Sequence, residues 1–352
     1  MPKPSRFMPG AWAFLFTSPP FFPYPMCSTL LRASNVKAAA RRLGFDACGL
    51  APAGPIDENC AAEFRRWLSE GRQGEMDYLA RNVEKRSDPR ELVPGARTVV
   101  CVALNYAPPQ RPGGEEGYTL ARYALGKDYH DIVRGRLQQL MTDIGAEGKG
   151  RAFCDTAPVL ERYWAWRTGL GWRGRNTQII SPDLGSYFFI GTLVLCLPTD
   201  AYDAPQKARC GTCRRCVEAC PAGALSEDGR LDARKCLSYL TIERRGPLPP
   251  EAGRLMGRCI YGCDRCAEAC PWNKTVHPTA LPELQASEPL MRMQPTDWQR
   301  MDVEQYRMLF RGSAVKRAKY EGLRRNIEAV HRAQQTENEE QPPAHSDGSI
   351  NT

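Results

Sequence analysis

The residues whose chemistry is easiest to identify are the cysteines of one short run. Residues 210–221 read Cys-Gly-Thr-Cys-Arg-Arg-Cys-Val-Glu-Ala-Cys-Pro, a Cys-x2-Cys-x2-Cys-x3-Cys-Pro pattern. In bacterial ferredoxins the first three thiolates of this pattern bind one [4Fe–4S] cluster and the fourth binds the other cluster. Residues 262–271, Gly-Cys-Asp-Arg-Cys-Ala-Glu-Ala-Cys-Pro, repeat the second half of the run. The repeat therefore predicts two clusters in pseudo-symmetric halves.

The pattern divides the thiolates between the two predicted clusters. The first cluster would take Cys210, Cys213, Cys216 and Cys270. The second would take Cys220, Cys263, Cys266 and one thiolate from outside the runs, because Ile260 stands where the repeat needs a cysteine. Cys236 and Cys259 are both candidates for that ligand. Paired zinc sites are an alternative, but they would use only the Cys-x2-Cys pairs; a disulfide framework is a weaker one.

The composition is that of a globular protein that uses cysteine for cofactors. At 352 residues the chain is long enough for two or three domains, and its 42% hydrophobic and 25% charged residues are typical of soluble globular proteins. Of its 15 cysteines, nine lie between residues 210 and 270. Such clustering in a long chain indicates cofactor binding in a reducing compartment, so we expect a cytoplasmic protein.

The formal net charge of +8 favours an acidic partner, nucleic acid above all, although a basic enzyme without such a partner would have the same charge. No apolar run reaches the length of a membrane span, so we expect no membrane association. Residues 8–17 faintly resemble a signal peptide, but the Pro-rich residues 19–25 follow without a clear cleavage site. We interpret residues 1–27 as a disordered or mistranslated extension, with Met26 as a candidate start.

The chain before the cysteines has the helix and strand patterns of an α/β or α+β domain. We expect a helix at 28–43, a helical region at 57–82 that Gly71 and Gly74 interrupt, and strands at 45–50, 97–104, 152–155 and 186–197. From residue 118 the chain should run through residues 122–130 into a helix that ends near 144. Asp155 ends one strand, just before a helix that Pro158 would open. That position suits a catalytic group at the end of a strand, although Asp155 could instead cap the helix.

Two further features of this domain could concern a large ligand. Asp128 and His130 begin the Asp-x-His-x-x-Gly motif of cobalamin proteins, but Val133 replaces its glycine. We interpret His130 as a structural or surface residue, with an axial ligand as the alternative. The glycine-rich residues 169–176 match no phosphate-binding motif, so their glycines could let the backbone approach a large ligand.

After the cysteines, residues 289–311 and 313–333 have helical patterns. In the second, apolar Val315, Leu323, Ile327 and Val330 fall on one stripe. The basic residues off this stripe could contact RNA phosphates; the candidates are Lys316, Arg317, Arg324 and Arg325. From residue 334 the tail is polar and acidic, and we expect it to be disordered.

Six stretches together resemble the epoxyqueuosine reductase family, cobalamin and iron–sulfur enzymes that complete queuosine in tRNA. They are residues 74–81, 122–130, 155–161, 169–172, 236–243 and 260–273. The resemblance implies a cobalamin-binding α/β domain at 28–200, related to reductive dehalogenases. It also implies a ferredoxin-like domain with two [4Fe–4S] clusters at 201–280, a helical tRNA-contacting region at 281–333 and a disordered tail at 334–352.

The resemblance also implies roles for individual residues. Asp155 would be the proton donor, with a pKa raised by burial beside the corrin, and Cys236 would be the missing cluster ligand in place of Cys259. The cobalamin contacts would be Arg81, Asp155, Asn176, Ile179, Ile190 and Ser238.

The expected reaction reduces epoxyqueuosine to queuosine at the wobble position of tRNA, using Co(I) cobalamin as a nucleophile fed by the two clusters. A flavodoxin- or ferredoxin-like protein would supply low-potential electrons to a monomer. The alternatives are a reductive dehalogenase-like enzyme, a ferredoxin-type electron carrier and a zinc-dependent RNA-binding module.

Overall fold

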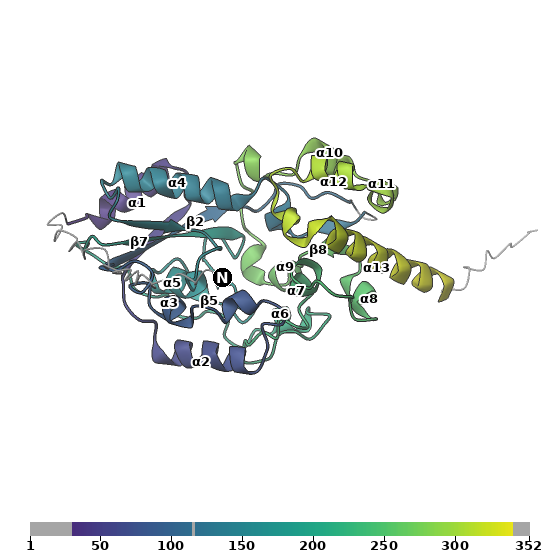
Figure 1. Cartoon of the computed structure of the whole chain (residues 1–352), viewed down its shortest axis with the longest axis horizontal. Coiled ribbons are helices and arrows are strands. Elements are labelled where there is room, and N and C mark those ends of the chain that lie inside the picture. The colour runs from purple at the N-terminus through teal and green to yellow at the C-terminus, as the bar shows by residue number, and fades with distance from the viewer. Residues whose placement is uncertain (1–29, 115–116, 341–352) are drawn as a thin grey trace, which may run out of the picture.

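The computed structural model describes residues 30–114 and 117–340. The expected extension at 1–27 lies outside these ranges. A sheet with its covering helices forms one end of the molecule, and the cysteine-rich segment and the C-terminal helices form the other (Figure 1). No helix within the described ranges is long and apolar enough to cross a membrane.

One four-stranded sheet organises the N-terminal half. Its strands are β1 (Ala47–Pro52), β2 (Thr98–Asn105), β4 (Gly150–Phe153) and β7 (Phe188–Leu195), in the order β1-β2-β7-β4. All three pairings are antiparallel. The placement of catalytic groups at the carboxyl ends of strands is a rule for open parallel sheets, so it does not apply to Asp155, whose role must rest on its contacts.

Helices cover both faces of this sheet (Figure 1). Helices α1 (Ala33–Arg42) and α4 (Tyr129–Asp143) pack on the face that carries Val100 and Val102, whereas α5 (Glu161–Arg167) packs on the face that carries Val99 and Cys101. Because alternate residues of a strand point to opposite faces, a strand covered on both sides must be apolar throughout. Strand β2 is accordingly buried at every position, and the expected strand at 97–104 is confirmed.

Shorter elements connect the sheet to the cysteine-rich segment. They are α2 (Glu58–Ser69), the 3₁₀ helix Asp77–Leu79, α3 (Val83–Ser87), β3 (Thr119–Leu120), the 3₁₀ helix Arg122–Ala124, β5 (Trp172–Arg173) and β6 (Ile179–Ile180). The stretch expected to lead from residue 118 into a helix ending near 144 is confirmed, since α4 spans Tyr129–Asp143. The short strand before it is an addition that the sequence did not indicate. This strand, β3, pairs in parallel with β8 (Cys259–Tyr261), which ties the N-terminal half to the cysteine-rich segment.

The glycine-rich turn also packs closely within the chain, and its expected approach to a large ligand stays a prediction. A side chain at Gly171 would have its Cβ 2.3 Å from the backbone oxygen of Ile180, a distance that real contacts do not reach. The absent side chain therefore lets β5 and β6 lie side by side.

Short helices build the rest of the molecule. They are α6 (Arg215–Glu218), α7 (Leu237–Ile242), α8 (Ala252–Met256), α9 (Arg265–Glu268), the 3₁₀ helices Pro271–Asn273 and Pro282–Leu284, α10 (Glu288–Arg292), α11 (Pro295–Arg300), α12 (Val303–Leu309), the 3₁₀ helix Ala314–Ala318 and α13 (Lys319–Glu340). The helix expected at 289–311 is thus three helices, and the one expected at 313–333 is interrupted at Lys319, whose φ is +61°. The tail expected from residue 334 is helical to Glu340, because α13 continues through it.

The C-terminal helices share one core with the cysteine-rich segment. Leu323, Ile327 and Val330 of α13, the apolar stripe expected from the sequence, pack with Leu237, Leu240 and Ile260. Asn326 is fully buried among them, and its amide nitrogen donates to the backbone oxygens of Thr241 (2.8 Å) and Ile260 (2.9 Å). Residues 281–333 therefore do not form a core of their own.

Candidate functional site

The cysteines of the first run meet Cys270 around one cavity. Cys210, Cys213, Cys216 and Cys270 all line it. Burial raises the pKa of the Cys216 thiol, and its neighbours Cys210 and Cys270 raise it further. These are the four thiols assigned by spacing to the first cluster, and Cys270 reaches them from the second run, as the ferredoxin pattern requires.

The remaining run cysteines lie near Cys236. The thiol of Cys266 has a raised pKa, through burial first and then through its neighbours Cys263, Cys236 and Cys220. The thiol of Cys259 lies 3.1 Å from the backbone oxygen of Gly262, to which it donates. Cys236 neighbours Cys220, Cys263 and Cys266, whereas Cys259 shares a cavity with Cys263 and its thiol hydrogen is already used. The arrangement therefore favours Cys236 as the remaining ligand.

The run cysteines and Cys236 form two groups of four thiols, and soft thiolates are the ligands that iron–sulfur clusters use. The cysteine set fits two such clusters.

The second feature of the site is the carboxylate of Asp155, in the loop between β4 and α5. Its φ is +58°, in the left-handed region, and its backbone N–H donates to Glu161 Oε1 at 2.9 Å. Helix α5 begins only at Glu161, with Leu160 as its N-cap. The alternative that Asp155 caps this helix is therefore wrong, and the loop turns the carboxylate away from the helix.

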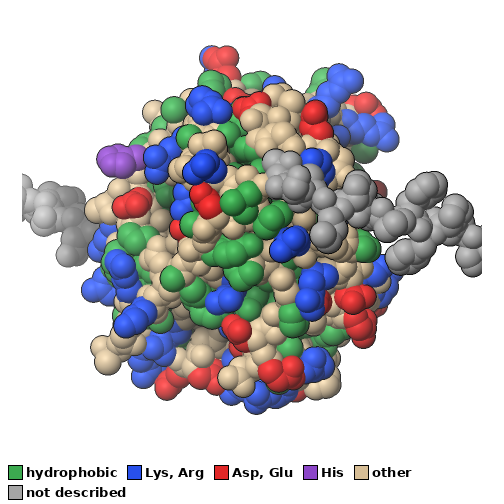
Figure 2. All heavy atoms as spheres, turned by 90° about the vertical axis from the view of Figure 1, so that its left-hand side faces the viewer, with side chains coloured by type: hydrophobic (Ala, Val, Ile, Leu, Met, Phe, Trp, Pro, Cys, Tyr) green, Lys and Arg blue, Asp and Glu red, His purple; other side chains and the backbone are tan. Residues whose placement is uncertain are grey.

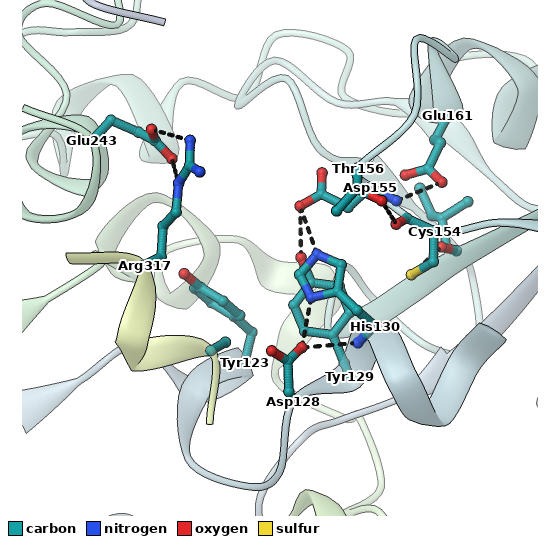
Figure 3. Close-up of polar contacts among 12 residues, drawn as sticks. Tyr123, Asp128, Tyr129, His130, Cys154, Asp155, Thr156, Glu161, Glu243 and Arg317 are labelled. Atoms are coloured by element: carbon teal, nitrogen blue, oxygen red, sulfur yellow. Dashed lines mark hydrogen bonds and ion pairs between the residues drawn. The ribbon is translucent and has the colours of Figure 1, made fainter. Parts of the chain in front are cut away.

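Two side chains of α4 hold the Asp155 carboxylate (Figure 3). The Tyr129 hydroxyl donates to Oδ2 at 2.8 Å, and His130 Nε2 lies 3.3 Å from the same oxygen. The other ring nitrogen of His130, Nδ1, lies 2.6 Å from Asp128 Oδ1. Tyr129 in turn stacks on Phe189 of β7 with ring centroids 4.1 Å apart. His130 thus bridges two carboxylates beside a packed aromatic wall.

This arrangement decides which groups carry protons near neutral pH. Burial by itself would lower the pKa of His130, but its hydrogen bonds to Asp128 and Asp155 raise that pKa to about 9. Burial would raise the pKa of Asp155, yet the hydrogen bonds from His130 and Tyr129 outweigh it and the net pKa lies below the ordinary value. The Asp155 side chain is 63% exposed and accepts two hydrogen bonds. The expectation that burial beside a corrin raises this pKa stays a prediction.

Glu161 differs from Asp155 although the two are neighbours. Burial raises the pKa of the Glu161 carboxyl to about 8, and the adjacent Asp155 charge adds to the effect. At neutral pH the site thus holds protons on His130 and Glu161, with an ionised carboxylate between them.

A loop from the other side of the site carries Tyr78 and Arg81. The buried guanidinium of Arg86 fixes it by donating to the backbone oxygens of Tyr78 (2.9 Å) and Arg81 (3.3 Å). Burial raises the pKa of Tyr78, and the negative charges of Glu243 and, more weakly, Asp155 raise it further. The Arg317 guanidinium lies over the Tyr78 ring, 5.5 Å from its centroid. The expected corrin contact Arg81 therefore comes from a loop that reaches the Asp155 region.

The other expected corrin contacts occupy several elements. Ile179 and Ile190 belong to the core beneath α5, and the Cys154 thiol donates to the backbone oxygen of Ile190 at 3.5 Å, directly beside Asp155. Ser238 lies on α7, two residues after Cys236. Asn176 is only 3% exposed, and its amide nitrogen has no hydrogen-bond partner among the described residues. A buried amide without a partner fits a residue that hydrogen-bonds a bound group. Because Asn176 also lines the cavity of the first four thiols, either a corrin or the first cluster would satisfy it.

The four residues expected to contact tRNA differ in whether their side chains are already paired within the protein. Lys316 is exposed and has no ion pair with any residue in the described ranges, whereas Arg317 makes a bidentate ion pair with Glu243 (2.7 and 2.9 Å). Arg324 pairs with Glu328. Arg325 donates to the backbone oxygens of Leu240, Arg244 and Gly246 and so ties α13 to the cysteine-rich segment. The interpretation of Arg325 as a phosphate contact is corrected, because its donors are occupied within the protein.

Sequence reasoning missed Tyr129, Glu161 and the role of His130. The Asp-x-His pair was visible, but its proximity to Asp155 depends on α4 crossing the sheet beside the end of β4. Val133, at the glycine position of the cobalamin motif, indicates that His130 is not an axial ligand. It gives no sign that His130 contacts a carboxylate.

The chain is similar to known proteins over most of its length. The family described as "Epoxyqueuosine reductase QueG, DUF1730" matches residues 86–156, and "4Fe-4S double cluster binding domain" matches residues 209–273. An epoxyqueuosine reductase of Leadbetterella byssophila is 42% identical over 300 residues, which are 84% of this chain and 97% of that protein.

Solved structures agree with the sequence relatives. An epoxyqueuosine reductase crystallised with an epoxyqueuosine-modified tRNA-Tyr stem loop superposes with a TM-score of 0.76 at 27% identity, covering 85% of this chain and 80% of that one. A Bacillus subtilis epoxyqueuosine reductase superposes with a TM-score of 0.75 at 27% identity, covering 85% and 81%; in that structure a catalytic loop with an aspartate is swung out of the active site. The expected relation to reductive dehalogenases stays a prediction.

Proposed function

The chain belongs to the epoxyqueuosine reductase family, and on that premise we propose that it reduces epoxyqueuosine to queuosine in tRNA, with cobalamin and two [4Fe–4S] clusters as cofactors and Asp155 as the proton donor. The observation that carries the proposal is the Asp155 carboxylate, held between His130 and Tyr129 in a chain 42% identical to a family member over 97% of that member's length. Two electrons and two protons convert the epoxide to a carbon–carbon double bond and water. When bound, the corrin supplies a reduced cobalt nucleophile whose electrons come from the clusters one at a time.

The cofactors would be held by residues from both halves of the molecule. Cys210, Cys213, Cys216 and Cys270 would bind one cluster, and Cys220, Cys236, Cys263 and Cys266 the other. Asn176 would give its unpaired amide to the corrin, beside Arg81, Ile179, Ile190 and Ser238. This division supports a reaction at the junction of the sheet and the cysteine-rich segment.

The protein's own contribution to the chemistry is the handling of protons. Opening an epoxide leaves an alkoxide, which must be protonated before the oxygen can leave. One proton converts it to a hydroxyl group that departs as hydroxide, and a second proton, from solvent, converts the hydroxide to water. Asp155 projects from its loop with an exposed carboxylate, so it can reach a substrate oxygen. Because its pKa is low in the free protein, it needs a proton from a neighbour, and His130 is protonated below a pH of about 9 and lies 3.3 Å away. We infer that His130 supplies Asp155, which passes the proton to the departing oxygen.

Other groups keep this relay in position. Asp128 orients the His130 ring through Nδ1, so that Nε2 faces Asp155. Glu161 accepts the Asp155 backbone N–H and so stabilises the left-handed turn that aims the carboxylate. The Tyr129 hydroxyl limits the motion of the same carboxylate oxygen.

The tRNA would approach over the surface formed by Tyr78, Arg317 and Lys316, next to the Asp155 site. Tyr78 is 36% exposed beside the site, and its ring carries the Arg317 guanidinium. An exposed aromatic ring with a cation over it suits stacking of an unpaired base, and the neighbouring Lys316 suits a phosphate.

The decisive experiment is a chemical one. The purified protein, reconstituted with clusters and cobalamin and reduced with dithionite, is incubated with epoxyqueuosine-containing tRNA, and the digested nucleosides are identified by mass spectrometry. We expect a new nucleoside 16 mass units lighter, the mass of one oxygen atom. Unchanged epoxyqueuosine with a fully loaded protein would overturn the proposal, and turnover of an organohalide instead would favour the dehalogenase alternative.

A further inference from the structure

The two pseudo-symmetric cysteine runs differ in what their intervening residues contact. In the second run, Asp264 accepts from the Arg122 backbone N–H at 2.8 Å, and Arg265 donates to the backbone oxygen of Met256 at 2.9 Å. Glu268, farther along the same run, pairs with Arg122. The connecting residues of this run are half-buried and bind it to the rest of the protein.

In the first run the equivalent residues face solvent. Arg214 and Arg215, between Cys213 and Cys216, are exposed, as are Gly211 and Thr212 before them. Among the described residues, the ion-pair partners of Arg214 are two other exposed side chains, Glu218 and Glu227. The first run therefore presents its cluster-binding loop at the surface, where the second run is docked inward.

This exposed loop carries more basic than acidic side chains, since only Arg214 among its basic residues is paired, with Glu218 and Glu227, in the part of the chain that the structure describes. Arg209 and Arg215 line the cavity of the first four thiols, and Lys207 is exposed just before it. Within the parts of the chain that the structure describes, neither Lys207 nor Arg215 has an ion-pair partner. We call Lys207, Arg209, Arg214 and Arg215 the basic rim. By contrast, the far end of the sheet domain mixes acidic and basic side chains around a central apolar area (Figure 2).

We propose that the basic rim is the docking surface for a small acidic redox protein that delivers single electrons to the first cluster. The inference rests on the proposed function, since it requires a cluster within the four thiols. The thiols next to the surface are those that an external donor can approach most closely, and a cationic rim steers an acidic partner to them. The second cluster, whose run is bound to the protein interior, then passes electrons inward.

A basic rim has another possible purpose, which the experiment must separate from docking. A [4Fe–4S] cube with four thiolates is negatively charged, so nearby arginines could simply offset that charge and tune the cluster. Lys207 and Arg214 do not line the cavity, and reversing their charge should leave cluster binding intact while it repels an acidic donor. The test variant is therefore Lys207→Glu/Arg214→Glu. The matched control is Arg41→Glu/Arg42→Glu, which makes the same charge change on exposed residues of α1, at the other end of the molecule (Figure 1).

The measurement is the rate at which clusters are bleached, followed by stopped-flow absorbance, with reduced flavodoxin as the donor probe and with dithionite in parallel. Iron content of each variant is determined first, so that failure of the clusters to assemble, which would count against the proposed function, is distinguished from failure of docking. We expect the flavodoxin rate constant at low ionic strength to fall about tenfold or more in the rim variant, with a flatter salt dependence. The control and all dithionite rates should match the wild type.

Three outcomes would overturn the proposal. An unchanged flavodoxin rate would place donor docking elsewhere. An equal loss with dithionite and flavodoxin would make the rim a tuner of the cluster. A loss of affinity for tRNA with normal reduction by flavodoxin would make it an RNA-binding surface.

Discussion

The cysteine-rich segment and the Asp155 site differ in how far apart in the sequence their working residues lie. Seven of the eight proposed cluster ligands fall within two runs of at most 11 residues, whereas Asp155, His130 and Glu161 come from a loop and two helices that pack on the sheet. A cluster needs thiolates at fixed local spacing, so its site is visible in the sequence. A proton relay needs only contacts, which exist once the chain has folded.

The largest expected effect tests whether Asp155, whose site is formed by tertiary contacts, takes part in the chemical step. Asp155→Asn keeps the size of the side chain and can still accept from Tyr129, but an amide cannot deliver a proton. We expect corrin and iron contents to be unchanged and single-turnover conversion of epoxyqueuosine-containing tRNA to fall by about 10²–10⁴-fold. The control is Asp131→Asn, which removes an exposed carboxylate on the same helix as His130 and should be silent. Wild-type turnover in Asp155→Asn would remove the proton donor from the proposal, and loss of corrin would make Asp155 a binding residue.

The next prediction tests the cluster-binding cysteines, and in particular whether Cys236 or Cys259 is the eighth ligand. Cys236→Ala should lose one of the two clusters, so that iron content falls by about half, while Cys259→Ala should keep both. The reason is that Cys236 is grouped with Cys220 and Cys263, whereas the Cys259 thiol donates to a backbone oxygen. Iron analysis and the cluster absorbance decide the point. Loss of iron only in Cys259→Ala would reverse the assignment.

A smaller effect should distinguish the role of His130 from that of Asp155 in proton transfer. His130→Gln preserves hydrogen bonding to Asp128 and Asp155 but cannot be protonated, so we expect single turnover to slow by up to about 10²-fold. Because the protonated form is the one that supplies Asp155, the wild-type rate should be present below pH 9 and decline as pH rises through about 9, the pKa of His130. In His130→Gln that decline should be absent. A wild-type profile retained in the variant would assign the titration to another group.

The smallest effect concerns the basic residues near α13. Lys316→Ala should weaken tRNA binding and reduce its log–log salt slope by roughly 0.7 to 0.9, as expected for one phosphate contact. Arg325→Ala should act on folding instead, because it leaves three backbone oxygens without their donor; a loss of roughly 1–3 kcal/mol of stability is expected. Filter binding across a salt series and thermal unfolding measure the two effects. Equal salt slopes for Lys316→Ala and wild type would remove Lys316 from the interface.

The sequence predicted the parts of the molecule that local pattern controls. The fully apolar strand β2, the apolar stripe of α13 and the two cysteine runs all follow from residue type and spacing. Errors arose where tertiary contacts decide. Thr119–Leu120 pairs with β8 although its pattern indicated no strand, and the helix that Pro158 was expected to open begins three residues later, at Glu161. The sequence could not indicate the two hydrogen-bond donors that lower the pKa of Asp155, because they lie 25 and 26 residues away in the chain.

The burial of Asn326 has a consequence for the order of events during protein synthesis. Its amide secures the backbone of Thr241 and Ile260, on either side of the segment that leads into the second cysteine run. Helix α13, which carries Asn326, is translated after every proposed cluster ligand, so the ligands leave the ribosome before the helix that completes their core. Stable cluster insertion should therefore follow translation of α13, and nascent chains that stop before Lys319 should expose the thiols to oxidation.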